Sequence, residues 1–385
     1  EEKKQVGIAK SEDRVDAYPL ALSGEMCQRV MIAIALAADP DLLVVDEPTT
    51  ALDTTTQARI IERLRRLATN TDTAILVISH DIDVVAKICD RVAVMYSGQV
   101  MEYGPTDRVV NSPEHPYTKG LVDCRITADS SYPLSTISGS VPDQSPDAGC
   151  RFASRCEYAT TDCRESIPPT VAVDGDHSVS CGELDTVRES EPTNPRQADT
   201  ESASQHSPTQ KARACYDGGS VQDNSTVSGL TDSTINGTTP AADDTAPPLF
   251  EARGVTKQFD CSTSVIKRWL NGSQTLTAVD DVDLAVGRNE TVGIVGESGS
   301  GKSTFGKLLT GLQTPTDGEI VFEGDLVGDV GTRDTEQLRD VGVVFQNPKD
   351  SINPRFTVRE TIAEPLVEAG WSQADQETRI NQLLN

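Results

Sequence analysis

The stretch TVGIVGESGSGKSTFGKLL, residues 291–309, constrains the fold of this chain more than any other. It reads as a short apolar strand, a glycine-rich loop that matches G-x-x-x-x-G-K-[ST], and an amphipathic helix. Phe305, Leu308, Leu309 and Leu312 fall on one face of that helix. Because strands joined by helices in this way build sheets covered on both faces, we expect an α/β fold of the P-loop type.

The glycine-rich loop predicts a phosphate site. Its glycines let the backbone approach a phosphate closely, and the amide groups of 299–304 lie at a helix N-terminus, which favours anions. Lys302 would bridge the β- and γ-phosphates, and Ser303 would hold Mg²⁺. The loop residues expected to hold the nucleotide are Gly296, Ser298, Gly299, Gly301, Lys302, Ser303 and Thr304.

The segment LLVVDEP, 42–48, is an apolar strand that ends in two carboxylates, as expected of a buried parallel strand opening into an active site. Asp46 would reach Mg²⁺ through water, and Glu47 would orient and deprotonate the attacking water. Simple solvation of a strand end is the alternative.

Two more strands end in polar residues. AILVIS, 74–79, leads to His80, a candidate for sensing the γ-phosphate, although a lone histidine is usually structural. The strand 341–345 leads to Gln346, for which we favour contact with Mg²⁺ or water over strand-end solvation, since ligands bind at this edge of α/β sheets.

Two further motifs are less specific on their own. Ser23 and Gly24 stand at the start of a helix, and Leu-Ser-Gly there is by itself only an N-cap. Phe259 either stacks on adenine or belongs to the core.

Taken together, these motifs resemble the ATPase subunits of ABC transporters, and the likeness covers 1–182 and 249–385. LSGEMCQRV resembles the family's signature, LLVVDEP its Walker B strand, TALD with Asp53 its D-loop and His80 its switch histidine. GESGSGKST resembles Walker A, and FQNP the Q-loop. Three segments are similar to the dipeptide/oligopeptide importers, a group that includes nickel importers. They are FQNPKDSINPRFTV (345–358), SPEHPYTKGLVD (112–123) and the Cys-rich tail GCRFASRCEYATTDCRESIPPT (149–170).

The resemblance implies ATP hydrolysis that drives peptide uptake at the cytoplasmic face of the plasma membrane. It also implies two membrane-spanning permease subunits, an extracellular peptide-binding protein acting indirectly, and a second ATPase domain paired head to tail. Nickel import, a soluble twin-ABC ATPase and an inert ATP-binding fragment are the alternatives. The most apolar run, 30–38, is about half as long as a bilayer span, so we expect membrane contact to go through a partner.

The motifs stand in reverse order, which predicts a fragment of a fused two-ATPase chain. The expected parts are the second half of one ATPase domain (1–124), a Cys-rich extension (125–182), a disordered acidic linker (183–248) and the first half of another domain (249–385). On this division Lys302, Ser303 and Gln346 face Ser23 and Gly24 across one site, while Asp46, Glu47 and His80 serve another. Alternatively, the two halves close on each other in permuted order.

The signature-like segment departs from the family at Glu25, where a second glycine is usual. A carboxylate ~5 Å from a γ-phosphate would cost roughly 3 kcal/mol at an effective dielectric constant of about 20. Either the Glu25 side chain turns away or the site is weak.

Four of the nine cysteines, Cys150, Cys156, Cys163 and Cys181, fall within one short segment. Their spacing lacks the pair of cysteines two to four residues apart (C-x2–4-C) that is typical of structural zinc sites. Four thiolates on a loop-rich segment instead suit an iron–sulfur cluster. Some members of the resembled group carry a [4Fe–4S] cluster here. Zinc or free thiols are the alternatives.

The net charge of −26 argues against nucleic acid as a partner, because phosphate contacts need a basic face. An acidic, lysine-poor surface suits a salt-rich cytoplasm, which favours a halophilic, haloarchaeal source. The alternative is that the acidic linker alone skews the total.

Overall fold

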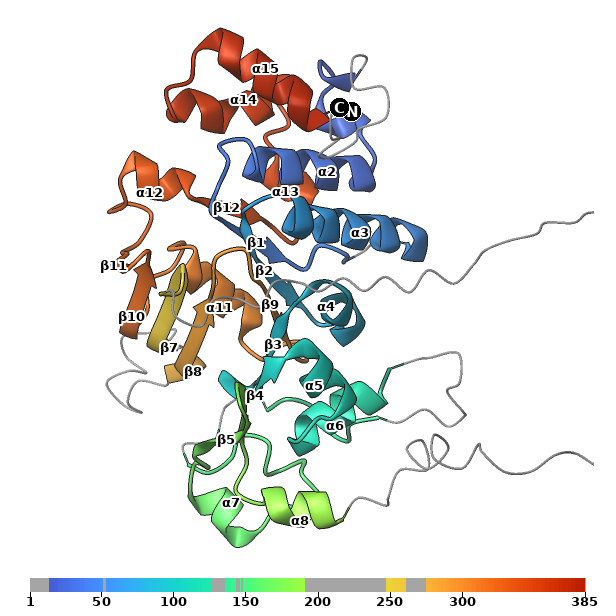
Figure 1. Ribbon diagram of the computed structural model, residues 1–385, viewed down its shortest axis with the longest axis vertical. Coiled ribbons are helices and arrows are strands. Elements are labelled where there is room, and N and C mark those ends of the chain that lie inside the picture. The colour runs from blue at the N-terminus through green and yellow to red at the C-terminus, as the bar shows by residue number, and fades with distance from the viewer. Residues whose placement is uncertain are drawn as a thin grey trace, which may run out of the picture.

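The computed structural model describes residues 14–50, 53–125, 136–142, 146, 148–190, 247–260 and 275–384 (Figure 1). Its strands are β1 (Leu42–Asp46), β2 (Ala74–Ser79), β3 (Arg91–Tyr96), β4 (Gln99–Pro105), β5 (Thr170–Asp174), β6 (His177–Ser180), β7 (Phe250–Asp260), β8 (Thr275–Val286), β9 (Thr291–Val295), β10 (Asp317–Phe322), β11 (Asp325–Leu326) and β12 (Val341–Val344). Its longer helices are α2 (Gly24–Ala35), α3 (Thr54–Asn70), α4 (Ile82–Ile88), α6 (Pro116–Asp123), α11 (Lys302–Leu309), α14 (Val358–Glu368) and α15 (Gln373–Leu384). Its shorter helical segments are η1 (Pro19–Ala21), α5 (Thr106–Asn111), α7 (Thr161–Glu165), α8 (Leu184–Glu189), α12 (Thr335–Arg339) and α13 (Pro348–Ser351).

The central sheet interleaves strands from the early and late parts of the chain. Its eight strands lie in the order β12-β1-β2-β9-β3-β4-β6-β5, and the first five pair in parallel. Strand β9 therefore lies between β2 and β3, and β12 lies beside β1. All five residues of β9 and all six of β2 are buried, as expected of parallel strands covered on both faces.

The other end of the central sheet is antiparallel and joins β4, from 1–124, to β5 and β6, from the C-terminal extension (125–182). Strand β4 pairs with β3 and with β6, and β6 pairs with β5. Buried Glu102 on β4 accepts hydrogen bonds from the backbone of Glu114 and His115 and from the ring of His177 on β6. The extension is thus attached to the main sheet by both backbone and side-chain hydrogen bonds.

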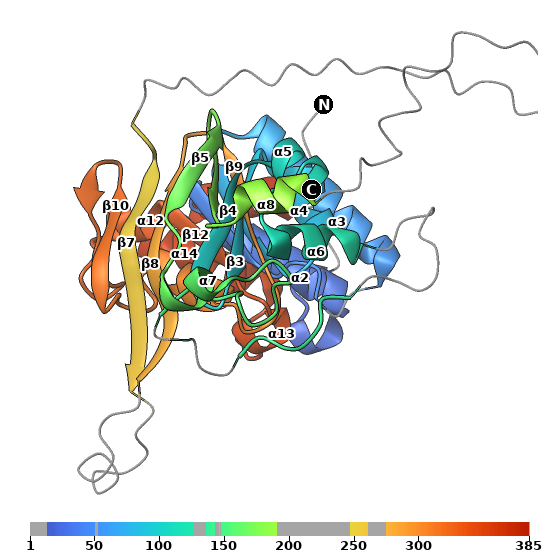
Figure 2. The same ribbon diagram turned by 90° about the horizontal axis from the view of Figure 1, so that it is seen from below.

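A smaller antiparallel sheet, β11-β10-β7-β8, faces the large one. Figure 2 shows β7, β8 and β10 on one side of the central strands and α3, α4 and α6 on the other. One apolar core fills the space between the sheets around α11, and a second lies between the central sheet and the opposite helices. The P-loop strand and helix are therefore held between two layers.

Helices α14 and α15 lie with α2 at one end of the molecule (Figure 1). A reciprocal pair of hydrogen bonds between Thr357 and Glu360 caps the start of α14, satisfying otherwise free backbone groups. The guanidinium of Arg379 on α15 donates to the carbonyls of Leu36 and Ala37 and pairs with Asp39. These contacts join α15 to the segment that directly follows α2.

The predicted strands 291–295 and 74–79 are confirmed at both ends, while the one at 341–345 stops a residue earlier, at Val344. The prediction for Leu312 is wrong, because α11 ends at Leu309 and Leu312 is exposed. The prediction of a disordered linker from 183 is wrong for its first residues, which are helical. Helix α8 covers Leu184–Glu189 and is fixed by buried Val187, while 191–246 lies outside the described residues.

Candidate functional site

The glycine-rich loop joins β9 to α11, and glycine is required there for two reasons. Gly299 and Gly301 have positive φ angles of 83° and 100°, a region that strains other residues. A side chain on Gly301 would also collide with the carbonyl of Ala278 on β8, and one on Gly296 with the carbonyl of Met95 on β3. The loop is consequently packed against both sheets.

Lys302 lies inside this loop and is only 4 % exposed. Its ammonium donates to the carbonyl of Gly296 at 2.8 Å, to the carbonyl of Glu297 at 2.9 Å and to the hydroxyl of Ser300 at 3.3 Å. Burial lowers the pKa of Lys302, while the negative charges of nearby carboxylates oppose that shift. The lysine is thus positioned where a phosphate group could replace these neutral acceptors.

Asp46 ends β1 and meets the start of α11. Its carboxylate accepts a 3.2 Å hydrogen bond from the hydroxyl of Ser303, a residue 257 positions later. Burial raises the pKa of Asp46, the hydrogen bond from Ser303 lowers it, and the adjacent charge of Glu47 raises it further. A carboxylate and a hydroxyl on neighbouring elements are suitable oxygen ligands for Mg²⁺, directly or through water.

Glu47 is the centre of a side-chain network at the same sheet edge. It has a positive φ of 48°, and its carboxylate accepts from the hydroxyl of Thr50 at 2.7 Å and from the amide of Gln346 at 2.8 Å. His80 Nδ1 lies 3.4 Å from its other oxygen. Burial alone would raise the pKa of Glu47, but the Thr50 hydrogen bond and His80 outweigh it and the pKa is lowered.

The parallel register explains why these residues meet. Asp46 pairs with Ile78, Ser79 with Val295, and Val45 with Val344, so the carboxyl ends of four strands share one edge. Strands β1 and β2 continue into Glu47 and His80, β12 reaches Gln346 after Phe345, and β9 continues into the phosphate loop. Such an edge is where open α/β sheets bind ligands.

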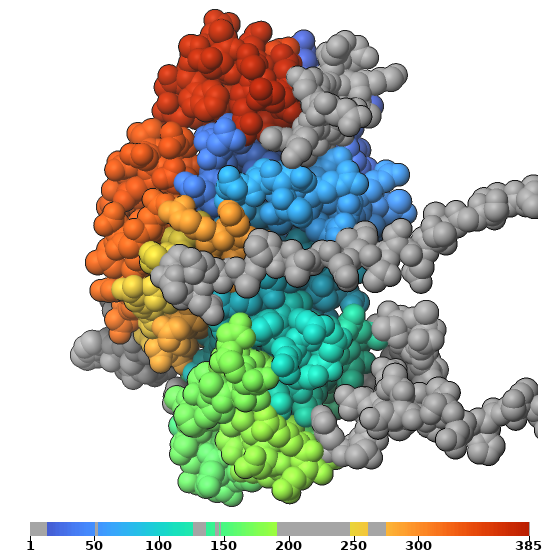
Figure 3. Space-filling view, viewed as in Figure 1, coloured from blue at the N-terminus to red at the C-terminus, as the bar shows by residue number. Residues whose placement is uncertain are grey.

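This arrangement differs from the expectation that the motifs are divided between two sites. Ser303 and Gln346 contact Asp46 and Glu47, so residues from both halves of the chain meet at one edge. The physical reason is the sheet itself, in which β9 and β12 pair with early strands that are buried on both faces. The space-filling view shows the early blue and cyan surface in contact with the late orange one (Figure 3).

Ser23 is the N-cap of α2, and Gly24 and Glu25 are the first two residues of that helix. Ser23 is exposed, and its side chain accepts from the amide of Met26. Glu25 pairs with Arg29 one turn along α2. The Glu25 carboxylate therefore has a cationic partner on its own helix.

Two other predicted site residues have local partners. Asp53 is the N-cap of α3 and accepts from the backbone amides of Thr55 and Thr56 and from the Thr56 hydroxyl. Phe259 lies near the end of β7, half-buried, with the ammonium of Lys257 5.3 Å from its ring centre. Ser298 is exposed on the loop and Thr304 lies in the first turn of α11.

The sequence prediction missed several residues around the site. Thr50 directly follows the DEP segment, and its proximity to Glu47 along the chain could have suggested the hydrogen bond. Arg155 binds the side chain of Glu297 in the phosphate loop from 142 positions away. No local pattern in the Cys-rich segment signals that contact.

The four clustered cysteines line one small cavity, together with His115, Phe152 and neighbouring residues. Burial raises the pKa of Cys150, Cys156 and Cys181, to about 11 for Cys156. Within the described ranges, no group of three or more His, Cys, Asp or Glu side chains is arranged to hold a metal ion. The thiols are thus gathered but not arranged as a ligand set.

None of the helices in the described part of the chain combines the length and the apolar character needed to cross a bilayer. The family model for the ABC transporter matches residues 2–50 and 279–385, and that for the oligopeptide/dipeptide transporter C-terminal region matches 101–163.

Two of the three relatives described here match along nearly the whole chain. The oligopeptide transport ATP-binding protein OppD of Mycobacterium tuberculosis is 35 % identical over 99 % of this chain and 56 % of its own length. The glutathione import ATP-binding protein GsiA of Salmonella typhi is 30 % identical over 96 % and 46 %. A putative peptide import ATP-binding protein of Brucella abortus is 46 % identical over 43 % and 50 %. The chain thus spans about half the length of these relatives, and it belongs to the ABC transporter ATP-binding family, in the group with the oligopeptide/dipeptide transporter C-terminal region.

Proposed function

We propose that this chain binds Mg·ATP between the phosphate loop and the carboxylates at the end of β1, and hydrolyses it. The observation that carries the proposal is the 3.2 Å hydrogen bond between Ser303 and Asp46, which joins the phosphate loop to the acidic strand end. The Glu47 network beside it supplies a base whose lowered pKa keeps it ionised. A base next to a phosphate-binding loop is the arrangement that phosphoryl transfer to water requires.

Each site residue has a proposed role. Glu47 orients and deprotonates the attacking water, and His80 and Gln346 hold the Glu47 carboxylate and sense the γ-phosphate. Ser303, Asp46 and Gln346 are the candidate Mg²⁺ ligands, and the bound ion would neutralise charge on the phosphates. Lys302 and the backbone of 296–304 bind the phosphates, and Phe259 stacks on adenine.

In this proposal, two motifs of this chain contact nucleotide that is bound to a second ATPase domain. Ser23 and Gly24 stand at the start of α2 and Asp53 at the start of α3, and we assign these helix starts to nucleotide held by a second ATPase domain in head-to-tail pairing. Glu25 is compatible with that role because its side chain pairs with Arg29.

We also propose that the hydrolysis powers import of di- or oligopeptides. The names of the relatives, which refer to oligopeptide, glutathione and peptide import, support a peptide substrate over nickel. The chain would then act at the cytoplasmic face of the plasma membrane on two permease subunits, with an extracellular peptide-binding protein delivering the cargo. The acidic composition supports a halophilic source organism with a salt-rich cytoplasm.

In the whole protein, we propose that 1–124 and 249–385 are halves of two different ATPase domains. The match to OppD runs through both halves in the order found here, within a longer chain. Because both domains would share one fold, either half can complete the sheet of the other. This equivalence of fold explains how 1–124 and 249–385 pair in one sheet in this chain, although each would belong to a different domain of the whole protein.

For the cysteines, we propose an iron–sulfur cluster held by Cys150, Cys156, Cys163 and Cys181. The donor type suits such a cluster, because four thiols line one cavity, although ligation requires the side chains to rearrange and lose their protons. Bound iron and sulfide after anaerobic reconstitution, lost in Cys156→Ser, would support the cluster. Zinc alone, or no metal, would refute it.

The decisive experiment measures Mg·ATP binding and phosphate release by this chain, by Lys302→Ala and by Lys87→Ala. Lys87 is an exposed lysine on α4 and serves as the matched control. We expect turnover by the unsubstituted chain and by Lys87→Ala, with binding weakened at least about tenfold in Lys302→Ala, since it loses a charge-assisted phosphate contact. Absence of ATP binding by the unsubstituted chain, or binding that is indifferent to Lys302, would refute the proposal.

A further inference from the structure

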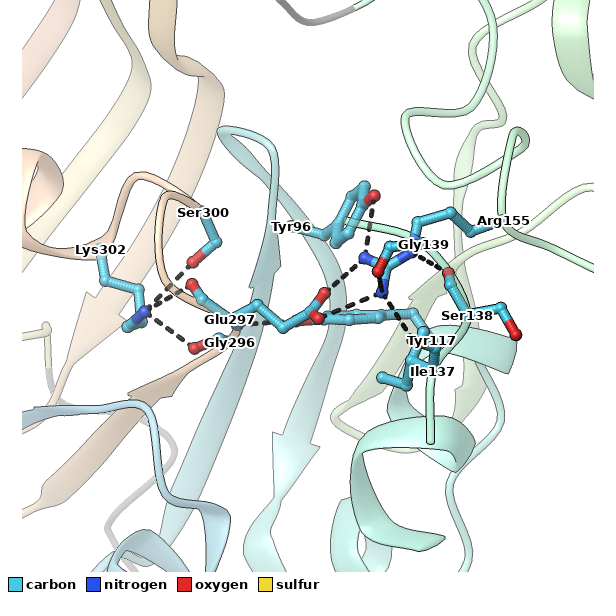
Figure 4. A network of polar contacts seen from close by, with 10 residues as sticks. All are labelled: Tyr96, Tyr117, Ile137, Ser138, Gly139, Arg155, Gly296, Glu297, Ser300 and Lys302. Atoms are coloured by element: carbon cyan, nitrogen blue, oxygen red, sulfur yellow. Dashed lines mark hydrogen bonds and ion pairs between the residues drawn. The ribbon is translucent and has the colours of Figure 1, made fainter. Parts of the chain in front are cut away.

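The C-terminal extension reaches the phosphate loop through one ion pair, between Arg155 and Glu297 (Figure 4). Arg155 Nη1 donates to one carboxylate oxygen at 2.6 Å, and Nη2 donates to the other at 3.1 Å. The Arg155 side chain is only 5 % exposed, and that of Glu297 is 29 % exposed. A bidentate pair of this kind fixes both position and orientation, which a single ammonium contact cannot do.

Arg155 is held rigidly on the side of the extension. Its Nε donates to the carbonyl of Ser138 at 2.7 Å, and Nη2 also reaches the carbonyls of Ile137 and Gly139 at 3.3 Å. The guanidinium further lies 5.7 Å from the ring centre of Tyr96, whose hydroxyl accepts from Nη1 at 3.3 Å. The arginine is therefore pre-organised and loses little freedom in holding Glu297.

Glu297 is in turn bound to the phosphate-binding machinery by its backbone. Its carbonyl accepts from the ammonium of Lys302 at 2.9 Å, and its amide donates to the hydroxyl of Tyr117 at 2.8 Å. Its carboxylate is one of the negative charges that oppose the lowering of the Lys302 pKa. One loop residue thus contacts the extension through its side chain and the phosphate-binding lysine through its carbonyl.

A carboxylate in a loop that binds a triphosphate is unfavourable unless a cation neutralises it, because like charges at short range in a partly buried site repel. We propose that Arg155 is a positioning residue for the nucleotide site: it neutralises Glu297 and fixes the phosphate loop, so that ATP affinity depends on the Cys-rich extension. This inference rests on the ATP-binding function proposed above. It adds a residue outside the nucleotide-binding motifs to the determinants of affinity.

The test is a calorimetric titration of the full 385-residue chain with Mg·ATP. We expect Arg155→Ala to weaken binding about tenfold, since it leaves a part-buried carboxylate without its partner. The double variant Arg155→Ala/Glu297→Gln removes the uncompensated charge, and we expect it to bind within about threefold of Glu297→Gln alone. The matched control is Arg188→Ala, which removes the pair with Glu114, away from the phosphate-loop residues, and leaves affinity unchanged.

The outcomes separate the two proposals. If the unsubstituted chain binds no ATP, the nucleotide-binding function itself fails. If it binds ATP and Arg155→Ala binds equally well, the inference is overturned while the function stands. If Arg155→Ala binds ATP weakly and the double variant Arg155→Ala/Glu297→Gln binds it no more tightly, Arg155 acts only through packing. Charge neutralisation is then refuted. Arg155→Lys keeps the positive charge but cannot make the bidentate contact, so we expect its affinity for Mg·ATP to lie between those of the unsubstituted chain and Arg155→Ala. This variant keeps the inference testable even if Arg155→Ala does not fold.

Discussion

The side-chain amide of Gln346 donates a 2.8 Å hydrogen bond to the carboxylate of Glu47, 299 positions earlier in the chain. The bond joins the ends of β12 and β1, which are adjacent parallel strands. Neither residue could reach the other unless the two halves of the chain shared a sheet.

The first prediction concerns Glu47 as the base. Glu47→Gln keeps the shape of the side chain but cannot take a proton from water, so we expect phosphate release to fall by about 10²–10⁴-fold with ATP binding retained. Steady-state release and equilibrium binding measure the two effects. Glu62→Gln, which alters an exposed carboxylate paired with Arg65 and Arg66 on α3, is the control and should leave both unchanged. Full turnover by Glu47→Gln would exclude Glu47 as the base.

The second prediction concerns pH. The pKa of Glu47 is lowered because the Thr50 hydrogen bond and His80 outweigh burial, so the base stays ionised as the pH falls and is lost only below its ordinary range. Thr50→Val removes the hydrogen-bond donor, which raises that pKa. The acidic limb of the kcat/KM profile should then move to higher pH by about one unit.

Thr69→Val, on the exposed face of α3, provides the comparison for Thr50→Val and should leave the profile in place. An acidic limb that stays at the same pH in Thr50→Val would show that Glu47 does not control it.

The third prediction tests the packing of the two halves. A Cβ atom added to Gly342 on β12 would lie 2.5 Å from the carbonyl oxygen of Ala35 at the end of α2. Gly342→Ala should therefore lower the free energy of unfolding by about 1–3 kcal/mol, because backbone must shift to admit the methyl group. Urea unfolding measures the change. Gly182→Ala, where a Cβ meets open space, is the control, and equal stability of the two variants would contradict the packing of β12 on α2.

The fourth prediction concerns His115, which is 1 % exposed and accepts a hydrogen bond from the amide of Tyr117 at the start of α6. Burial lowers its pKa to about 3, below the 6.5 of an ordinary histidine. The native state therefore favours the neutral ring, and stability is lost as the pH falls below the unfolded-state value toward the folded one.

His115→Asn keeps a side chain that can cap α6 but does not titrate. Between about pH 7 and pH 4, the unsubstituted protein should lose about 3 kcal/mol more unfolding free energy than this variant. Urea titrations across that range measure the difference. Parallel losses in the two proteins would mean that other groups carry the acid sensitivity.

Much of the site could be predicted because it depends on local patterns. The runs 42–46, 74–79 and 291–295 fix buried parallel strands, so Glu47, His80 and the phosphate loop, which follow them, must lie at one sheet edge. The distribution of motifs between sites was not predictable in the same way. It depends on which strands pair, and two halves of equivalent fold offer more than one pairing.

The contact between Arg155 and Glu297 shows what local patterns leave out. Arg155 sits between Ser154 and Cys156 in a segment without periodicity, and its role depends on where the extension packs on the central sheet. By contrast, Asp53 is a helix cap as well as part of a recognisable motif, and both roles can be read from the same short stretch of sequence. Residues whose function depends on packing between distant segments need the structure.

The place of β9 between β2 and β3 has a consequence for how this 385-residue chain folds by itself. Strands β2 and β3 precede β9 by about 200 residues in the sequence, and each has an edge of unpaired backbone groups until β9 pairs with it. Sheets closed by such distant contacts form slowly. Until β9 inserts, the refolding chain exposes two strand edges to neighbouring molecules, so aggregation competes with refolding at this step.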